Sequence, residues 1–301
     1  MELRQLRYFI KAAELLNFSE AAKASFVSQS TLSQQIKQLE DELGVQLFQR
    51  NSHDVSLTEE GLQLLPFAHE TVSSADNCVA QMNELKNLLT GTLYIGVTYS
   101  FSSILTETML DFSRRYPKVK LHVVYKTMEE LMNMLQHREL DFVLAYKPSE
   151  VYPRIESEVL FSTPLSVIAR SSHPLMQLKQ VSLDDLQHYD MAMPMKGMQP
   201  RQVLDEWIGS DLDSRLNVRM ELNDINILLN ILEKSSYVSI LSATTIHDAE
   251  DLSAVPLALE HNKMEGCIHS LRGQHKKNSA IAFCRILKES TSVRKYALGL
   301  D

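Results

Sequence analysis

The sequence predicts an α/β protein built from a small, mainly helical N-terminal region, one long helix and a larger α/β region. Three observations support this prediction. Helical periodicity extends from residue 1 to about 45, a second helical pattern extends from 58 to 89, and strand and helix patterns alternate after residue 91. With 301 residues, of which 44% are hydrophobic, the chain can bury a sizeable core and should form about two domains.

Composition and charge narrow the class of protein. The N-terminal stretch MELRQLRYFIKAAE is charged throughout and is not a secretory signal. No stretch approaches the ~18 consecutive apolar residues that a membrane span needs. The cysteines Cys78, Cys267 and Cys284 have neither paired nor metal-like spacing, which fits a reducing compartment. We therefore expect a cytoplasmic protein without a membrane segment, and the net charge of −8 confines any DNA-binding surface to a local patch.

Two short helices are expected at the start of the chain. One face of the first is marked by Leu3, Leu6, Phe9 and Ala13. The second should extend from about Ser19, as its N-cap, to Ser25. A tight connection through Phe26 and Val27 leads to a third helix.

The third helix, with Ser28 as its N-cap, has two different faces. Its apolar stripe consists of Leu32, Ile36, Leu39 and Leu43. Its opposite face carries Gln29, Ser30, Ser33, Gln34 and Lys37. These side chains suit the major groove of DNA, because Gln can pair with adenine through two hydrogen bonds and Ser or Thr can bind a base or a phosphate. The order of helices therefore predicts a helix-turn-helix. The alternative is an ordinary solvated amphipathic helix.

A hairpin and a long helix should follow. Residues 45–58, VQLFQRNSHDVSLT, predict two short strands around a turn at 51–54, which would form a wing. The long helix is expected from the cap Thr58 to Leu89, with Gly91 just past its end and a kink near Pro66. Its apolar residues, spaced by three and four as in a coiled-coil seam, are Leu65, Ala68, Val72, Ala75, Val79, Met82, Leu85 and Leu89. We expect this seam to pair two copies of the chain. The alternative is that it packs on its own domain.

After residue 91 the pattern is that of βαβ units, which predicts a largely parallel sheet covered by helices. The predicted strands are LYIGV, KLHVVY, LDFVLAY, TPLSVIAR, NVRMEL, YVSILS and CIHSLR. The predicted helices lie at about 103–115, 128–137, 200–209, 223–234 and 281–290.

Candidate ligand-binding residues in this region follow strands and open helices, where α/β domains commonly bind ligands. The first group is a hydroxyl-rich turn with Thr98, Ser100, Phe101 and Ser102. The second group is Met195, Lys196, Gly197 and Arg201, of which the two cations would suit an acidic ligand. Asn223, at the start of a further helix, completes the expected site. The alternatives are helix capping for the hydroxyls and solvated positions for the cations.

Several short motifs occur together in the first 62 residues. They are Ala21-Ala22, Val27-Ser28-Gln29, Leu32-Ser33, Gln35-Ile36, Leu39-Glu40, Leu43-Gly44, Leu47-Phe48, Arg50, Leu57-Thr58 and Gly61. In this combination the segment resembles the N-terminal domain of the LysR-type bacterial transcriptional regulators. The resemblance implies a winged helix-turn-helix, a linker helix and an effector-binding domain of two α/β subdomains, like periplasmic solute-binding proteins.

The resemblance also implies which residues meet DNA. They would be Ser28, Gln29, Ser30, Thr31, Ser33, Gln34 and Lys37, with Arg50 at the wing. Ser30 replaces a frequent proline of the family and Gln34 a frequent arginine. Residues 1–60 hold six basic and nine acidic residues, so one such domain would bind DNA weakly and several should act together.

The expected organisation has three parts: a DNA-binding domain at 1–58, a linker helix at 59–90 and an effector-binding domain at 91–301. One subdomain would comprise about 91–162 and 267–301, and the other about 163–266. The expected partners are double-stranded DNA with an imperfect inverted-repeat operator, further copies of the chain in a homodimer or homotetramer, and RNA polymerase. No cofactor is expected apart from a small, anionic effector between the subdomains.

Other functions have less support in the sequence. An enzyme is not expected, because the motifs GxGxxG, GxxxxGK[ST], GxSxG and HExxH are missing from it. A stand-alone solute-binding protein would have no use for residues 1–60. A redox-responsive regulator of the same architecture stays open, although no cysteine lies between Cys78 and Cys267, where the family's peroxide sensors carry a pair.

Overall fold

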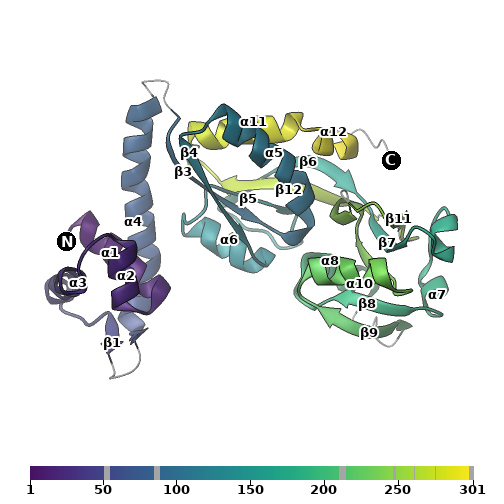
Figure 1. Ribbon diagram of the computed structural model, residues 1–301, viewed down its shortest axis with the longest axis horizontal. Helices are drawn as coiled ribbons and strands as arrows, with labels where there is room; N and C mark the ends of the chain where they lie inside the picture. Colours follow the sequence, from purple (N-terminus) through teal and green to yellow (C-terminus); the bar gives the residue numbers. More distant parts are fainter. Residues whose placement is uncertain are drawn as a thin grey trace. The chain divides into compact units, whose positions relative to one another are not determined.

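The computed structural model describes residues 1–50, 55–84, 89–209, 215–246, 249–260, 262–274 and 276–297. Contacts divide the chain into two compact units (Figure 1). The first holds residues 1–88 and 137–139, and the second holds residues 89–136 and 140–301. The first is mainly helical and the second is α/β, so the predicted fold class is confirmed. In the part of the chain that the structure describes, no helix is both long and apolar enough to cross a membrane.

Three helices form the body of the first unit. They are α1 (Leu3–Leu15), α2 (Phe18–Ala24) and α3 (Gln29–Leu43). The N-cap of α2 is Asn17, whose side chain accepts hydrogen bonds from the amides of Ser19 (2.9 Å) and Glu20 (3.1 Å). The prediction of Ser19 as the cap is wrong, because Asn17 already satisfies the first free amides and Ser19 lies inside the first turn.

Helix α3 buries the predicted apolar stripe. Leu32, Ile36 and Leu39 have no exposed surface, whereas Leu43 is 39% exposed at the end of the helix. Ser28 caps the start, as predicted: its Oγ accepts a hydrogen bond from the amide of Thr31 at 3.1 Å. Because the stripe faces the core, the polar face of α3 must face outward.

A hairpin closes the helical core of the first unit. Strands β1 (Phe48–Arg50) and β2 (Val55–Leu57) pair antiparallel, which confirms the two predicted strands, and the predicted turn at 51–54 lies outside the described residues. The ring of Phe48 packs edge-on against those of Phe9 and Phe18, at centroid distances of 5.6 and 5.2 Å. Aromatic pairs of this geometry contribute beyond their buried area, so they fix the hairpin to the helices.

Helix α4 (Glu59–Glu84) starts at the predicted cap and continues through Pro66. The Oγ1 of Thr58 accepts a hydrogen bond from the amide of Gly61 at 3.0 Å. A Cβ on Gly61 would lie 2.2 Å from the carbonyl oxygen of Leu47, so only glycine allows this close approach. Residues 85–88, which the predicted helix includes, lie outside the described residues.

The predicted seam of α4 divides into two halves. Leu65, Ala68 and Val72 pack into the core of their own unit, where Ala68 is 1% exposed. For this half, the alternative of packing on its own domain is correct. Val79, further along the same helix, is 61% exposed and leaves the core. The side chain of Met82 and residue Leu85 lie outside the described part of the helix.

The first sheet of the second unit has five strands in the order β4-β3-β5-β12-β6. They are β3 (Gly91–Val97), β4 (Val119–Tyr125), β5 (Phe142–Tyr146), β6 (Ile155–Thr163) and β12 (Met264–Leu271). Strand β3 is parallel to β4 and β5, while β12 is antiparallel to β5 and β6. Strand β6 is missing from the predicted strands, because Glu156 and Glu158 interrupt its apolar pattern at the edge of the sheet.

The second sheet has the order β10-β7-β11, and a parallel pair β8-β9 accompanies it. The strands are β7 (Leu165–Arg170), β8 (Asp190–Pro194), β9 (Asn217–Leu222), β10 (Ser239–Ser242) and β11 (Leu252–Pro256). Both neighbours of β7 are antiparallel to it. The prediction of a largely parallel sheet is therefore wrong. The chain passes between the sheets after β6 and returns before β12, and the returning strand enters the first sheet antiparallel.

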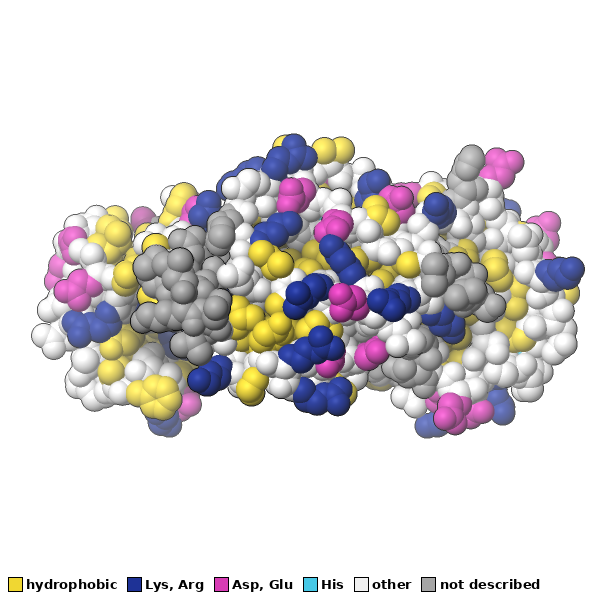
Figure 2. All heavy atoms as spheres, turned by 90° about the horizontal axis from the view of Figure 1, so that it is seen from above, with side chains coloured by type: hydrophobic (Ala, Val, Ile, Leu, Met, Phe, Trp, Pro, Cys, Tyr) yellow, Lys and Arg dark blue, Asp and Glu magenta, His cyan; other side chains and the backbone are white. Residues whose placement is uncertain are grey.

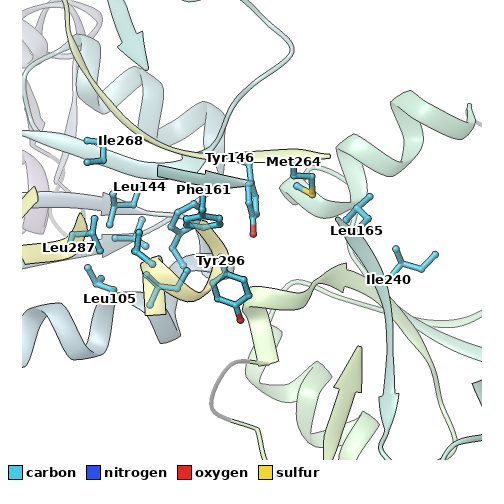
Figure 3. Packing of buried hydrophobic residues seen from close by; sticks show 14 of the residues in the cluster. Leu105, Leu144, Tyr146, Phe161, Leu165, Ile240, Met264, Ile268, Leu287 and Tyr296 are labelled. Atoms are coloured by element: carbon cyan, nitrogen blue, oxygen red, sulfur yellow. The ribbon is translucent and has the colours of Figure 1, made fainter. Parts of the chain in front are cut away.

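Helices cover both faces of the first sheet (Figure 1). On one face lie α5 (Ser102–Arg115), α11 (Asn278–Glu289) and α12 (Thr291–Ala297), and on the other lies α6 (Met128–Gln136). The second sheet is accompanied by α7 (Leu183–Leu186), α8 (Gln199–Ile208) and α10 (Ile225–Lys234). Short 3-10 turns occur at η1 (Tyr99–Phe101), η2 (Pro174–Gln177) and η3 (Ala243–Ile246). Figure 3 shows part of the core, where the ring of Phe161 packs against those of both Tyr146 and Tyr296.

The side chain of Asn262 forms hydrogen bonds with the backbone at both places where the chain passes between the sheets. The Oδ1 of Asn262 accepts a hydrogen bond from the amide of Leu165 at 2.7 Å, and its Nδ2 donates to the carbonyl oxygens of Leu165 and Leu257 at 2.8 and 2.7 Å. Backbone groups that leave a sheet need other partners when they are buried, and this side chain supplies them.

His269 is buried in the middle of β12, and its described hydrogen-bond partners are all uncharged. Its Nε2 lies 3.2 Å from the carbonyl oxygen of Ala145, to which it donates, and its Nδ1 accepts from the hydroxyl of Ser157 at 2.8 Å. Burial lowers the pKa of His269 to about 4, although the backbone carbonyls act in the opposite direction. The folded protein therefore keeps this ring neutral at pH values where the unfolded chain binds a proton.

We expect the free energy of unfolding to fall as the pH decreases from about 6.5 to about 4, because only the unfolded state gains a proton on His269 over this range. The full difference corresponds to about 3 kcal/mol. Urea unfolding at a series of pH values should show a flatter dependence for His269→Gln than for the wild type. Replacing the exposed His122 by Gln is the control, and an unchanged pH dependence in His269→Gln would contradict a neutral buried ring.

Candidate functional site

The first candidate site is the outward face of α3. The structure exposes Ser28, Gln29, Ser30, Thr31, Gln34 and Lys37, and leaves Ser33 half-buried. These seven residues lie outside the buried stripe, at the start of α3 and on the surface that the stripe leaves open. Arg50 ends strand β1, but its side chain lies outside what the structure describes.

Hydroxyl groups cluster at the start of α3. The Oγ of Ser28 lies 2.9 Å from that of Ser30 and 2.8 Å from the Oγ1 of Thr31, in addition to its cap contact. The predicted capping function of Ser28 is thus present, and it holds two further hydroxyls in fixed positions. Such groups can donate to phosphate or base acceptors that approach the helix start.

Gln29 is oriented by a contact from the preceding helix. The hydroxyl of Ser19 donates to the Oε1 of Gln29 at 2.9 Å. This contact orients the carboxamide at the start of α3 and engages its oxygen. Preorganisation of a side chain reduces the entropy lost when it binds. Sequence reasoning assigned Ser19 to capping and missed this positioning role.

The acidic residues near α3 are largely engaged elsewhere. The Oε1 of Glu40 accepts hydrogen bonds from the amides of Leu47 and Phe48 at 2.8 and 3.3 Å, which turns the carboxylate toward the wing. Glu42 pairs with the amino group of Met1. Glu20 pairs with Lys23 at 2.8 Å. Contacts within the unit therefore set the positions of these three carboxylates, while the net charge of the region stays negative.

The second candidate site begins with the turn after β3. Thr98 and Ser100 are buried, and the carbonyl oxygen of Ser100 accepts a hydrogen bond from Thr244 Oγ1 at 3.2 Å. Phe101 is a core residue, whose ring lies 5.1 Å from that of Tyr146, and the hydroxyl of Ser102 donates to the carbonyl of Tyr99 at 2.9 Å. Phe101 thus packs in the core, and the hydroxyl of Ser102 is used in a local hydrogen bond to the preceding turn, while α5 has no side-chain N-cap.

The second segment connects β8 to α8. Met195 and Lys196 are exposed, and Gly197 has φ +91°, a conformation that favours glycine. Arg201 differs from what the sequence suggested, because it is 1% exposed. Its Nε contacts Asp205 at 2.9 Å and its Nη1 contacts Glu221 at 3.0 Å. An anion at Arg201 would have to compete with these two carboxylates, so the structure gives this residue a structural ion pair.

Asn223 is exposed and directly precedes the N-cap of α10. The cap is Asp224, whose Oδ1 accepts hydrogen bonds from the amides of Asn226 and Ile227 at 2.8 and 3.1 Å. One apolar cluster lies next to both of the first two segments: Tyr99 packs against the cluster that contains Met198. The predicted segments therefore meet at the junction of the two sheets.

A buried polar network at this junction was not predicted. The hydroxyl of Tyr146, at the end of β5, contacts Ser242 and Thr244 Oγ1, and Thr244 continues the network to Ser100. Burial raises the pKa of Tyr146 well above its usual range, so the phenol stays protonated. The only sequence signal was a tyrosine at the end of an otherwise apolar strand.

Gln199 strengthens the same junction. Its side chain accepts from the amide of Tyr146 at 3.1 Å and donates to the carbonyl oxygen of Tyr146 at 2.7 Å. One amide side chain from α8 thus satisfies both backbone groups at the end of β5. Tyr146 is thus bonded through its backbone to Gln199 of α8 and through its hydroxyl to Ser242 of β10. These contacts connect the end of the first sheet to the elements of the second.

Some buried hydroxyls at the junction stay without a partner. Among the residues that the structure describes, Thr98 Oγ1 and Thr245 Oγ1 are buried and form no hydrogen bond. A buried polar atom without a partner is costly, and a ligand that supplies one gains the corresponding free energy. This is the strongest indication of a ligand position beside the turn at Thr98.

Metal and thiol chemistry have little support. Within the described ranges there is no group of three or more His, Cys, Asp or Glu residues that could hold a metal ion. Burial raises the pKa of Cys267 to about 11 and that of Cys284 to about 12. Since the thiolate is the reactive form, both side chains are poor redox sensors near neutral pH.

Comparison with protein families gives two matches that together span most of the chain. Residues 3–62 match the family described as bacterial regulatory helix-turn-helix protein, lysR family. Residues 86–292 match the LysR substrate binding domain.

Characterised proteins with similar sequences include several transcriptional regulators. The regulator BudR of Raoultella terrigena is 35% identical over 188 residues, which cover 62% of this chain and 65% of BudR. The activator IlvY of Haemophilus influenzae is 32% identical over 69% of this chain and 72% of its own length. The dual regulator GltC of Bacillus subtilis is 27% identical over 92% of both chains.

Solved structures show the same fold. Full-length OxyR of Pseudomonas aeruginosa has a TM-score of 0.72 at 22% identity, covering 99% of this chain and 96% of OxyR. Full-length CbnR complexed with its target DNA has a TM-score of 0.67 at 22% identity, covering 99% of this chain and all of CbnR (100%).

Proposed function

The chain belongs to the LysR family of DNA-binding transcriptional regulators, and we propose that it reads its operator with the exposed polar face of α3. The observation that carries this proposal is the preorganised start of α3, where Ser19 holds Gln29 and Ser28 holds its two neighbouring hydroxyls. Gln29 and Ser33 would read bases, because their side chains match donor and acceptor groups in the major groove. Lys37 and Arg50 would hold phosphates.

Replacing Gln29 by Ala should cost roughly 1–3 kcal/mol of operator binding and relax the preference at one base position. Lys37→Ala should weaken binding to all sequences alike and lower the salt dependence by about one unit. The measurement is selection of binding sites from a random duplex library, followed by titration of the selected duplex.

Gln38→Ala is the matched control, because Gln38 is also an exposed glutamine of α3 but lies nine residues further along the helix, about 13 Å from its start at a rise of about 1.5 Å per residue. If Gln29→Ala selected the same sequences with the same affinity as the wild type, this face of α3 would not be the reading surface.

We propose that copies of the chain associate through two surfaces. The first is the outer half of α4, where Val79 is exposed after the stripe has left its own core. The second is the face of the second unit over α5 and α11, where hydrophobic side chains lie among Lys and Arg (Figure 2). Leu110 of α5 and Ile281 of α11 are exposed there. Two separate surfaces allow a homodimer to assemble further into a homotetramer, which would bring several weak DNA-binding domains to one operator.

A carboxylate introduced on either surface should prevent association through that surface, because burying an unpaired charge is unfavourable. Sedimentation velocity should therefore show a smaller oligomer for Val79→Glu and for Ile281→Glu than for the wild type. Gln63→Glu adds the same charge at another exposed position of α4 and is the control. An unchanged oligomer in Val79→Glu would remove the α4 surface from the proposal.

We propose that a small effector binds at the junction of the two sheets, beside Thr98 and Ser100 and the segment from Met195 to Gly197. The unpartnered Oγ1 of Thr98 is the main support. An anionic effector is favoured by the helix start after Thr98, where the helix dipole places partial positive charge. The charge of Arg201 is already balanced by Asp205 and Glu221. A ligand there can change DNA binding only if it favours one arrangement of the assembly.

Thr98→Val should leave the unliganded protein as stable as the wild type or slightly more stable, since it removes a hydroxyl that lacks a partner. The same change should weaken effector binding by roughly 1–3 kcal/mol. A thermal-shift screen with small carboxylates and their neutral amides identifies the effector, and calorimetric titration then measures its affinity.

Thr108→Val is the matched control, because Thr108 Oγ1 is also buried without a partner but lies in the middle of α5. Equal effector affinity in Thr98→Val and the wild type would place the effector elsewhere. A stronger response to amides than to carboxylates would refute the anionic class.

The relatives of the chain are transcriptional regulators, and we propose a regulatory role without enzymatic activity. The alternative of a redox-responsive regulator has less support, because Cys267 and Cys284 are held as thiols by burial. A stand-alone solute-binding protein is also disfavoured, because residues 3–62 match a DNA-binding family.

A further inference from the structure

Phe26, in the turn between α2 and α3, has almost no contact with the rest of the protein. It is 96% exposed, the highest value of any large hydrophobic residue in the described part of the chain. A fully solvated phenyl ring gains nothing from burial, so Phe26 does not contribute to the core of the first unit.

The backbone of Phe26 is also unfavourable for its side chain. Its φ is +56°, in the left-handed region that suits glycine or asparagine. The turn has the hydrogen bonds of a Schellman motif: the amide of Phe26 donates to the carbonyl of Lys23 at 3.1 Å, and that of Val27 donates to the carbonyl of Ala22 at 3.0 Å. Glycine would fit this position without strain, whereas phenylalanine destabilises it.

The turn itself has a clear structural purpose that does not require the ring. It directs Val27 toward the core, against which it packs, and places Ser28 as the cap of α3. Any residue that tolerates a positive φ could do this. A bulky side chain at a strained and exposed position therefore suggests a contact outside the chain.

The proposed DNA-reading surface of α3 begins next to this position. Phe26 comes two residues before the cap of α3 and three before Gln29, and recognition helices of this class present their first residues to base edges. The ring is thus continuous with the proposed reading surface. Residues 1–60 are also poor in basic side chains, so contacts that do not depend on charge carry more of the binding.

We propose that Phe26 is a specificity-determining residue that contacts the C5-methyl group of a thymine beside the bases read by α3. Thymine is the base that offers an apolar group in the major groove, and phenylalanine is among the side chains that contact it. The inference rests on the proposed reading face of α3, to which it adds an apolar contact.

The test compares Phe26→Gly with the wild type as full-length proteins. Thermal unfolding should show that the variant is as stable as the wild type or more stable, because glycine relieves the strain and no packing is lost. In binding-site selection from a random duplex library, the variant should lose the preference for thymine at one position of each half-site. Its affinity for the duplex selected by the wild type should fall about fourfold per half-site, which is the effect of one buried methyl group.

Replacing that thymine by deoxyuridine removes only the methyl group. The wild type should lose about fourfold per half-site, whereas Phe26→Gly should bind both duplexes equally. Val151→Gly is the control for an exposed apolar side chain outside the first unit, since Val151 is 87% exposed. It should behave as the wild type.

Two results would overturn the proposal. The first is an unchanged thymine preference in Phe26→Gly. The second is that Phe26→Gly loses as much affinity for the deoxyuridine duplex as for the thymine duplex, which would show that the ring does not contact the methyl group. Gln29→Ala, measured alongside, separates this failure from failure of the reading face, because it should lose base preference even if Phe26 is not involved.

Discussion

Burial of one aliphatic stripe on α3 determines the architecture of the first unit. Leu32, Ile36 and Leu39 are fully buried, so the rotation of the helix about its axis is fixed to within a fraction of a turn. The caps at Asn17 and Ser28, the strained turn at Phe26 and the packing of Phe48 accompany this orientation and complete the unit around it. The polar face of α3 is therefore presented outward by the same apolar burial that stabilises the unit.

The second unit depends on a different constraint, which is the satisfaction of polar groups where the chain passes between two sheets. Asn262 forms hydrogen bonds with the backbone at the two passages, and Gln199 forms hydrogen bonds with both backbone groups of Tyr146. The Tyr146 hydroxyl extends the network through Thr244 to Ser100, next to the proposed effector position. A ligand there would meet a network that already connects both sheets, which offers a route by which binding can favour one arrangement of the unit.

The hydrogen bonds and ion pairs at this junction distinguish polar residues with a structural role from candidate ligand-binding residues. Arg201 is nearly inaccessible and paired with two carboxylates, so its charge is already compensated within the chain. Thr98 Oγ1 is buried without a partner among the described residues. A group that is already satisfied gains little from a ligand, whereas an unsatisfied one gains a full hydrogen bond. By this criterion the hydroxyl of Thr98 is a better candidate for ligand binding than the guanidinium group of Arg201.

The sequence by itself determined the fold class, the three short helices, the buried stripe of α3, its cap at Ser28, the wing strands and the cap at Thr58, because each depends on residues within one or two turns of one another. Tertiary structure decided the remainder. Periodicity could not show that Leu65, Ala68 and Val72 face their own core while Val79 leaves it, since both halves of the stripe have the same spacing. Nor could it show that Glu221 would meet Arg201, or that Ser242 and Thr244 would meet Tyr146. Those contacts join residues far apart in the chain, and they exist only after the strands have chosen their neighbours and directions, which local patterns leave undetermined.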